Sequence, residues 1–414
     1  MHVQIDIPGT DVQGRAFLSW TPVQVTARLV DGAGTGTTVD VVFGNNPGAA
    51  FVGKMNFGVS RTGTFGSSVT VKLPRSGAPR TFWVQGRFGR PSVAYGDANI
   101  KAVEKGVGTV LAEKSCMVRV RKNAQTLSAG ERNRFLAALG TLNGVGQGRF
   151  TDFRDMHVQA ASAEAHGNTG FLPWHRAYVL DLERELQRID SSVTLPYWRF
   201  DQPAPALYTT AFMGASGAGD IVQFTPGHPL EQWTTDGQVG ITRGLRFPVN
   251  GIPPSMISEV DTLALGGVNN IFASFRGMES SPHGRAHTGF RGFINAIATA
   301  AKDPLFFLLH ANADRLWAKW QWLHHRTSPA DPSAYAVPSP NRVGHRIDDT
   351  MWPWNGVTTA PRPPTAPGGA FEGSPVTTLP GASPIVRAMI DFQAAGGGEH
   401  LGFAYDDVPF ELAA

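Results

Sequence analysis

Hydrophobic and polar residues alternate along the first third of the chain, which is typical of half-buried β-strands. The clearest runs are residues 23–30, 39–43 and 68–73, where Val, Leu and Phe recur at every second position or in short β-branched groups. Gly, Asn and Pro interrupt these runs at short intervals, as in antiparallel sheets joined by tight turns. We therefore predict that residues 1–122 form an all-β sandwich or barrel.

After residue 122 the hydrophobic spacing becomes helical. Ser128 lies three residues before Glu131, the pattern of a capping box, and apolar residues follow at helical intervals. Three more helices are expected at about 153–164, 173–189 and 304–325. The last two begin with Pro, which suits a first helical turn, and Asp303 can cap the final one.

The rest of the second half has weaker signals. Residues 208–270 are expected to form long loops with short helices, and residues 327–385 are rich in Pro, Gly and Ser. The sequence therefore predicts an α+β protein with two domains, residues 1–122 and 123–414. The second domain would contain the loop-rich segment 327–385 and a closing segment, 386–414.

Composition and charge restrict the classes of partner. The 414 residues are 42% hydrophobic and carry a net charge of +3, with Lys and Arg scattered along the chain. This distribution does not favour a nucleic-acid partner. No stretch is apolar and long enough to span a membrane, and the first residues lack the pattern of a signal peptide, so we expect a cytoplasmic protein without a membrane partner.

The chain contains a single cysteine, Cys116, which excludes an intramolecular disulfide and any Cys-rich metal site. A metal ion would therefore need histidine or carboxylate ligands. The N-terminal region contains one histidine, His2, which argues against a copper-binding role there. A scaffold, a lid or an interaction domain is the simpler interpretation.

Six histidines of the second half form two spaced groups. Eight residues separate His157 from His166, and eight separate His166 from His175. The first and last of these would lie on two helices and the middle one in the connecting loop before Gly167.

In the second group, His283 and His287 are four residues apart on one helical face, and His310 lies on the next long helix. Each group could hold one metal ion and leave a coordination position open. Imidazole ligands without a thiolate suit copper or zinc. Spacing alone does not distinguish a coupled copper pair from two independent zinc ions. The other histidines, His2, His228, His324, His325, His345 and His400, are expected not to bind metal.

Several longer motifs surround these histidines. They are HGNTGFLPWHR at 166–176, LPYW at 195–198, PHGRAH at 282–287, DPLFFLLHANADRLW at 303–317, MWPWN at 351–355 and LGFAYDDVP at 401–409. Together they resemble the type 3 copper proteins, the superfamily of tyrosinase, catechol oxidase and haemocyanin, and in particular the bacterial-type polyphenol oxidases. The resemblance extends over roughly 280 residues in the same order.

The resemblance implies a helical domain with a four-helix bundle and a dinuclear centre of two copper ions. His157, His166 and His175 would hold one copper ion, and His283, His287 and His310 the other. It also implies that Phe306 packs beneath the copper pair. Asp314, four residues after His310, could support that ligand or simply pair with an arginine such as Arg176 or Arg315.

Some positions depart from the family pattern. Glu164 stands where many members have a cysteine that forms a thioether, so no thioether is expected. Leu309 stands where the family often has a second histidine. The family activates a water molecule with a Glu and an Asn when it hydroxylates monophenols. Glu279 occupies the first position, but Gly284 replaces the Asn. A base without its partner is poorly placed for proton transfer.

The sequence therefore predicts a copper-dependent polyphenol oxidase that uses oxygen to convert o-diphenols or o-aminophenols to o-quinones, with weaker monooxygenase activity on monophenols. Residues 294–302 contain no Phe to gate the first copper, which predicts an open entrance. The alternatives are a reversible oxygen carrier of haemocyanin type and a zinc protein. The natural phenol, the oligomeric state and a partner protein that delivers copper remain open.

Overall fold

The computed structural model describes residues 1–32, 34–160, 164–335, 344–355, 385–398 and 400–412. The chain divides into two compact units. The first comprises Met1–Val120 and Gly402–Leu412, and the second comprises Arg121–Leu401. The first is rich in β-strands and the second is mainly helical, as the change in hydrophobic spacing predicts.

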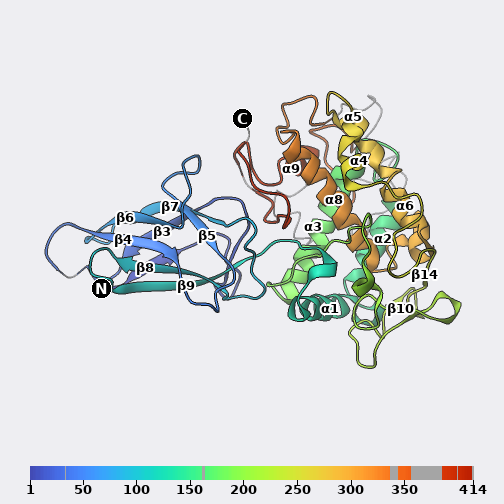
Figure 1. The fold of residues 1–414 in the computed structure, drawn as a ribbon, viewed down its shortest axis with the longest axis horizontal. Helices are drawn as coiled ribbons and strands as arrows, with labels where there is room; N and C mark the ends of the chain where they lie inside the picture. The colour runs from blue at the N-terminus through green and yellow to red at the C-terminus, as the bar shows by residue number, and fades with distance from the viewer. Residues whose placement is uncertain (33, 161–163, 336–343, 356–384, 399, 413–414) are drawn as a thin grey trace. The chain divides into compact units, whose positions relative to one another are not determined.

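The first unit contains two sheets, drawn in blue and teal in Figure 1. Its strands are β1 (Val3–Asp6), β2 (Ala16–Leu18), β3 (Val23–Leu29), β4 (Thr38–Asn45), β5 (Met55–Gly58), β6 (Ser68–Pro74), β7 (Arg80–Gly86), β8 (Ala98–Glu104) and β9 (Val110–Val118). The four-stranded sheet has the order β1-β3-β7-β5 and the five-stranded sheet the order β2-β9-β8-β4-β6. Neighbouring strands are antiparallel except β2 and β9.

The two sheets share one hydrophobic core. Alternate residues of β3 point inward, so that Val25, Ala27 and Leu29 are buried. Phe43 of the larger sheet stacks on Phe82 of the smaller sheet, with ring centroids 4.5 Å apart. The period of two in the sequence therefore produces one buried face on each sheet, and the two faces meet.

The closing segment differs from the expected domain boundary. We placed residues 386–414 in the helical domain, but Gly402–Leu412 belong to the β unit. The indole N–H of Trp20 donates to the main-chain oxygen of Tyr405 at 2.8 Å, and Ala404 is buried in the β core. These contacts join residues almost four hundred positions apart, which local sequence patterns do not reveal.

The second unit is built from helices of very different lengths. They are α1 (Ala129–Asn143), α2 (Phe150–Ala160), α3 (Phe171–Ile189), α4 (Glu259–Leu263), α5 (Phe272–Phe275), α6 (His283–Thr288), α7 (Ile297–Ala300), α8 (Leu305–Leu323) and α9 (Val386–Ile390). Within this unit, α3 packs against α1 and α8 (Figure 1). The predicted helices at 153–164, 173–189 and 304–325 correspond to α2, α3 and α8.

Helix starts follow the signals in the sequence. Ser128 caps α1, and the side chains of Ser128 and Glu131 form the reciprocal capping box. The Asp303 carboxylate accepts a hydrogen bond from Leu305 N–H at 2.9 Å at the start of α8. The same carboxylate forms a buried ion pair with Arg243, which the sequence analysis did not predict.

The long region between α3 and α8 contains short strands as well as the expected loops and short helices. The short strands are β10 (Ala215–Ser216), β11 (Val222–Gln223), β12 (Thr234–Thr235), β13 (Gln238–Val239), β14 (Arg243–Leu245) and β15 (Phe290–Gly292). β14 pairs with β15, immediately after α6, and so ties this region to the helix that carries His283 and His287. Much of the predicted loop-rich segment 327–385 lies outside the described residues.

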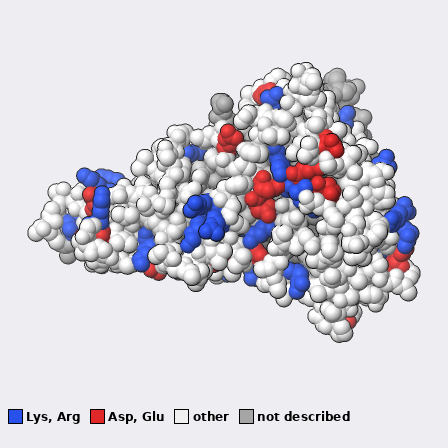
Figure 2. Space-filling view, viewed as in Figure 1, with Lys and Arg blue, Asp and Glu red and all other residues white. Residues whose placement is uncertain are grey.

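Charged side chains are interspersed on the face shown in Figure 2, where acidic and basic groups of the described residues often lie side by side. None of the helices that the structure describes has the length and apolar character required to cross a membrane. The cytoplasmic location stays a prediction from the sequence.

Candidate metal centre

The first histidine group comes from two helices and the loop between them. His157 lies on α2, His175 lies on the first turns of α3, and His166 lies in the connecting segment next to Gly167. Gly167 has a φ of +75°, a left-handed conformation that glycine adopts without strain and that helps the loop turn back. One ring nitrogen of each histidine lies within 4.8 Å of the others, so the three imidazoles could hold one metal ion.

The second group converges more tightly. The Nε2 atoms of His283, His287 and His310 lie 3.1–3.2 Å from one another. His283 and His287 project from one face of α6, and His310 comes from the middle of α8. This group also meets the geometric requirement for a metal site.

Main-chain oxygens orient three of the six imidazoles. The Nδ1 atoms of His175, His283 and His287 donate to the carbonyls of Phe171, Glu279 and Ile294 at 2.7–2.8 Å. Nδ1 donation fixes the tautomer in which Nε2 carries a lone pair, the form that binds a metal ion. His175 Nε2 is buried without a hydrogen-bond partner among the described residues, as expected for an atom reserved for a metal ion.

Burial keeps these imidazoles neutral. Desolvation, with smaller contributions from neighbouring imidazoles, lowers the pKa of His157, His175, His283 and His310 well below 6.5. Desolvation also lowers the pKa of His287 to about 4. All five rings therefore offer lone pairs at neutral pH without first losing a proton.

The two triads are adjacent. The rings of His175 and His310 stack with centroids 4.2 Å apart and planes 16° apart. The Phe306 ring lies 4.1 Å from the ring of His310 and 4.6 Å from that of His157, so it contacts both triads from one side. Packing of Phe306 beneath a copper pair stays a prediction from the resemblance.

Phe171 has the same relationship to the triads, but the sequence analysis did not select it. Its ring lies 4.7 Å from the ring of His175 and 4.8 Å from that of His283. Phe171 precedes His175 by four residues, just as Phe306 precedes His310. The same four-residue spacing in the sequence could have identified Phe171 as a residue that packs on the triads.

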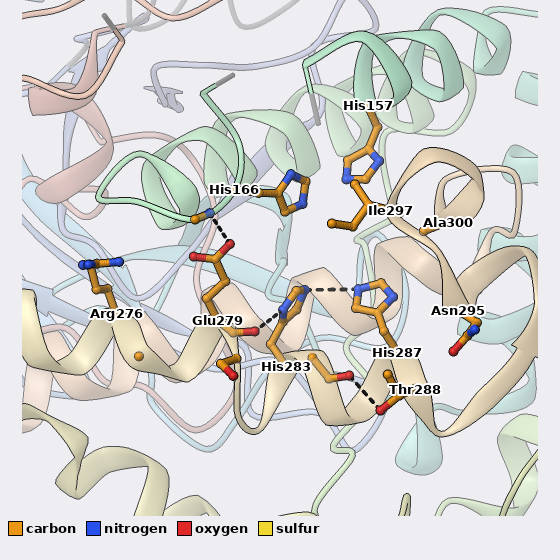
Figure 3. Close-up of a pocket in the computed structure, with 14 residues that line it drawn as sticks. His157, His166, Arg276, Glu279, His283, His287, Thr288, Asn295, Ile297 and Ala300 are labelled. Atoms are coloured by element: carbon orange, nitrogen blue, oxygen red, sulfur yellow. Dashed lines mark hydrogen bonds between the residues drawn. The ribbon is translucent and has the colours of Figure 1, made fainter. Parts of the chain in front are cut away.

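A cavity of about 460 Å³ opens onto the triads (Figure 3). Four of the histidines line it: His157, His166, His283 and His287. His175 and His310, with exposed fractions of 2% and 0%, are not among its lining residues. Ile297 and Ala300 form part of the wall, and the open entrance stays a prediction.

Glu279 and Gly284 both line this cavity. A carboxylate oxygen of Glu279 accepts from Gly167 N–H at 2.6 Å. Burial raises the pKa of Glu279 to about 7, although the bond from Gly167 and the charge of Arg276 oppose the shift. A Cβ at Gly284 would have only the main-chain oxygen of Glu279 within contact range, at 3.4 Å, so the wall has room for a side chain there.

Asp314 pairs with arginines and does not hold His310. Its carboxylate accepts from Arg176 Nε at 2.5 Å and from Arg121 Nη1 at 3.1 Å, and all three side chains are buried. His310 Nδ1 makes no hydrogen bond within the described part of the chain. Of the two roles considered for Asp314, the geometry supports ion pairing, with Arg176 as one of the partners.

Glu164 occupies the position where family members often have a cysteine. Its side chain is buried, and its carboxylate accepts from Trp352 N–H at 3.0 Å. The acidic side chain therefore links the His166 loop to residues near 352 by a hydrogen bond. Leu309, which precedes His310, is fully buried.

The donor set fits copper. Among the described residues, the two histidine triads are the groups of His, Cys, Asp or Glu whose geometry suits a metal ion, and both consist of imidazole alone. Imidazole ligands suit copper and zinc, whereas magnesium and calcium prefer oxygen ligands. His2, His228, His324, His325, His345 and His400 belong to neither group.

Comparison with known proteins distinguishes between copper and zinc. Residues 147–323 match the family model described as the common central domain of tyrosinase. Tyrosinase from Streptomyces glaucescens is 32% identical over 271 residues, which is 58% of this chain and 94% of that protein. Grixazone synthase from Streptomyces griseus is 28% identical over 302 residues, covering 59% of this chain and 96% of that protein.

Solved structures give a weaker similarity. A polyphenol oxidase from Thermothelomyces thermophila is 19% identical with a TM-score of 0.46, covering 69% of this chain and 88% of that chain. A functional unit of octopus haemocyanin is 18% identical with a TM-score of 0.46, covering 70% of this chain and 69% of that chain. The sequence relatives, together with the two triads, show that the chain belongs to the tyrosinase family of dicopper phenol oxidases.

Proposed function

We propose that the protein uses oxygen to oxidise o-diphenols or o-aminophenols, and that it hydroxylates monophenols more slowly. In the proposed centre, His157, His166 and His175 hold one copper ion, and His283, His287 and His310 hold the other. Helices α2, α3, α6 and α8, which carry five of these ligands, would act as the four-helix bundle of the family. The observation that carries this proposal is the position of two adjacent imidazole triads at one cavity.

The copper pair would supply the capacity to take electrons from a phenol and pass them to oxygen. Two molecules of catechol lose four electrons and four protons to one molecule of oxygen, giving two quinones and two waters. The protein's part is to orient the imidazoles through main-chain carbonyls and to admit the ring of the phenol to the cavity.

The preference for diphenols rests on Glu279 and Gly284. A monophenol must lose a proton before it is hydroxylated, and Glu279 is the carboxyl group in the cavity that can accept one. Its carboxylate is engaged by Gly167 N–H, and Gly284 offers no side chain to hold a water molecule beside it. Catechols already carry both hydroxyl groups and need no hydroxylation.

The test compares oxygen uptake by copper-loaded protein with a catechol and with its matching monophenol. We expect the catechol to react at least about tenfold faster, since one general base typically contributes two or more orders of magnitude. Gly284→Asn, which restores the family's amide at that position, should raise the rate with the monophenol and change the catechol rate little. Equal rates with both substrates in the native protein would overturn the proposed preference.

The oxygen-carrier alternative makes a different prediction. A carrier would bind oxygen reversibly and leave catechol unoxidised. The open cavity favours the enzyme, because a phenol can reach four of the six proposed ligands directly.

A further inference from the structure

The cavity contains one cationic side chain that the dicopper chemistry does not use. Arg276 lies on η6 (Arg276–Glu279), a short 3-10 helix that precedes α6, and it lines the cavity together with Glu279. Residues three apart in a 3-10 helix lie on the same side, so both side chains rise from η6 toward the His166 loop (Figure 3). Asn295 lies at the opposite side of the view, beyond His287.

Arg276 is partly buried, yet within the described residues its side chain forms neither a hydrogen bond nor an ion pair. Its charge acts on the Glu279 carboxyl group, but that carboxylate accepts a hydrogen bond from Gly167 N–H. Many other arginines of this unit are paired, for example Arg121, Arg176 and Arg243. A partly buried cation that forms no direct ion pair can bind an anionic ligand.

The wall beside Arg276 leaves room for such a ligand. Gly167 and Gly277 line the same cavity, and a Cβ built at either would have no atom within 4 Å. A ring whose hydroxyl groups face His157, His166, His283 and His287 could therefore carry a substituent toward Arg276 without displacing a side chain. The planar guanidinium can donate two parallel hydrogen bonds to a carboxylate.

We infer that Arg276 selects phenols that carry a carboxylate substituent. This inference rests on the proposed oxidation of phenols in the same cavity and specifies the class of phenol. Arg276 acts as a specificity-determining residue that binds the substituent, away from the reacting hydroxyl groups.

The experiment uses copper-loaded full-length protein and three catechols of matched size: 3,4-dihydroxyphenylacetic acid, its neutral methyl ester and the cation dopamine. Unsubstituted catechol reports the oxidase activity itself. We expect the KM of the acid to be about tenfold or more below that of the ester, and that of dopamine to be higher still. A tenfold change corresponds to about 1.4 kcal/mol, at the lower end for a hydrogen bond to a charged group.

Arg276→Gln should remove the preference for the acid over the ester, while Arg276→Lys should retain part of this preference because the charge remains. Arg246→Gln removes the same charge from an exposed position outside the cavity and serves as the matched control. An acid preference that survives Arg276→Gln, or its absence in the native protein, would overturn the inference.

A binding measurement separates this inference from the proposed function. Benzoate lacks hydroxyl groups and cannot be oxidised, so its binding can be followed by ligand-observed NMR whether or not catechol reacts. If catechol is not oxidised, the proposed function fails. Benzoate binding that is lost in Arg276→Gln and kept in Arg246→Gln would still support the anion subsite, and equal binding by all three proteins would refute it.

Discussion

The imidazoles of His175 and His310 stack face to face, with centroids 4.2 Å apart, although they come from different triads and from helices more than a hundred residues apart. The contact means that the two metal sites share one wall. Two isolated zinc sites would not require this closeness, whereas a dinuclear centre does. The pairing of α3 with α8 is therefore the feature of the helical unit that makes the two triads one site.

The aromatic ring beneath the triads gives a first prediction. Phe306 is fully buried and contacts His157 and His310, so Phe306→Ala should lower the free energy of unfolding by about 3–5 kcal/mol and also weaken copper binding. Phe307→Ala is the matched control. Phe307 is the next residue in the sequence and is also buried, but its ring packs on Phe150, Phe153 and Tyr178.

Urea unfolding of the metal-free proteins and competition with a copper chelator would measure the two effects. Both variants should lose similar stability, and only Phe306→Ala should lose copper affinity. Equal copper affinities in the two variants would show that the ring has no role in holding the ligands.

The buried arginines beside the site give a second prediction. Asp314→Asn removes a carboxylate that accepts from Arg176 and Arg121, and should lower the free energy of unfolding by about 3–5 kcal/mol, because buried cations lose a counter-charge. Asp220→Asn, which breaks an exposed pair with Arg291, should cause no comparable loss. Urea unfolding of both variants checks the difference, and similar losses would contradict the assigned role of Asp314.

The pH dependence of copper binding is a third prediction. Protons compete with copper only below the pKa of each imidazole, and burial lowers that pKa to about 4 for His287 and well below 6.5 for His157, His175, His283 and His310. Copper affinity of the His283–His287–His310 triad should therefore fall far less between pH 7.5 and pH 5.5 than that of solvated imidazoles. Three ordinary imidazoles would lose about 1000-fold over that range.

Chelator competition at several pH values measures this dependence. A steep loss of affinity between pH 7 and pH 6 would mean that the imidazoles are solvated and that the buried arrangement described above is wrong.

Glu279 supplies a fourth prediction. Since burial raises its pKa to about 7, the carboxylate that can accept a proton predominates only above that pH. Monophenol hydroxylation should therefore rise about tenfold from pH 6 to pH 8, and Glu279→Gln should remove the rise. Catechol oxidation should lack this dependence. Initial rates with a matched monophenol and catechol, measured at several pH values, test this prediction. An unchanged pH dependence of monophenol hydroxylation in Glu279→Gln would exclude Glu279 as the base.

Local signals in the sequence predicted much of this structure. The Ser128 cap, the Pro-led helices and the alternation in residues 23–30 depend on neighbours along the chain, and each corresponds to an observed element. The two histidine groups were visible because helical and loop spacings bring their members together. Their closeness to one another depends on packing between α3 and α8, and only the family resemblance anticipated it.

Long-range contacts were not predicted. The pairing of β14 with β15, the buried Arg243–Asp303 pair and the attachment of Gly402–Leu412 to the β unit join distant segments without a local pattern. The sequence did not identify Arg276 as a site residue for a similar reason. It resembles any surface arginine in the sequence, and only the cavity shows that it faces the same space as the histidines.

The most direct test of the central claim is a copper titration of the metal-free protein, followed by oxygen uptake with catechol. The account predicts that activity reaches its maximum at two copper ions per chain and that His310→Ala abolishes it. Maximal activity at one copper ion per chain, or no oxygen uptake at any loading, would contradict a dicopper phenol oxidase.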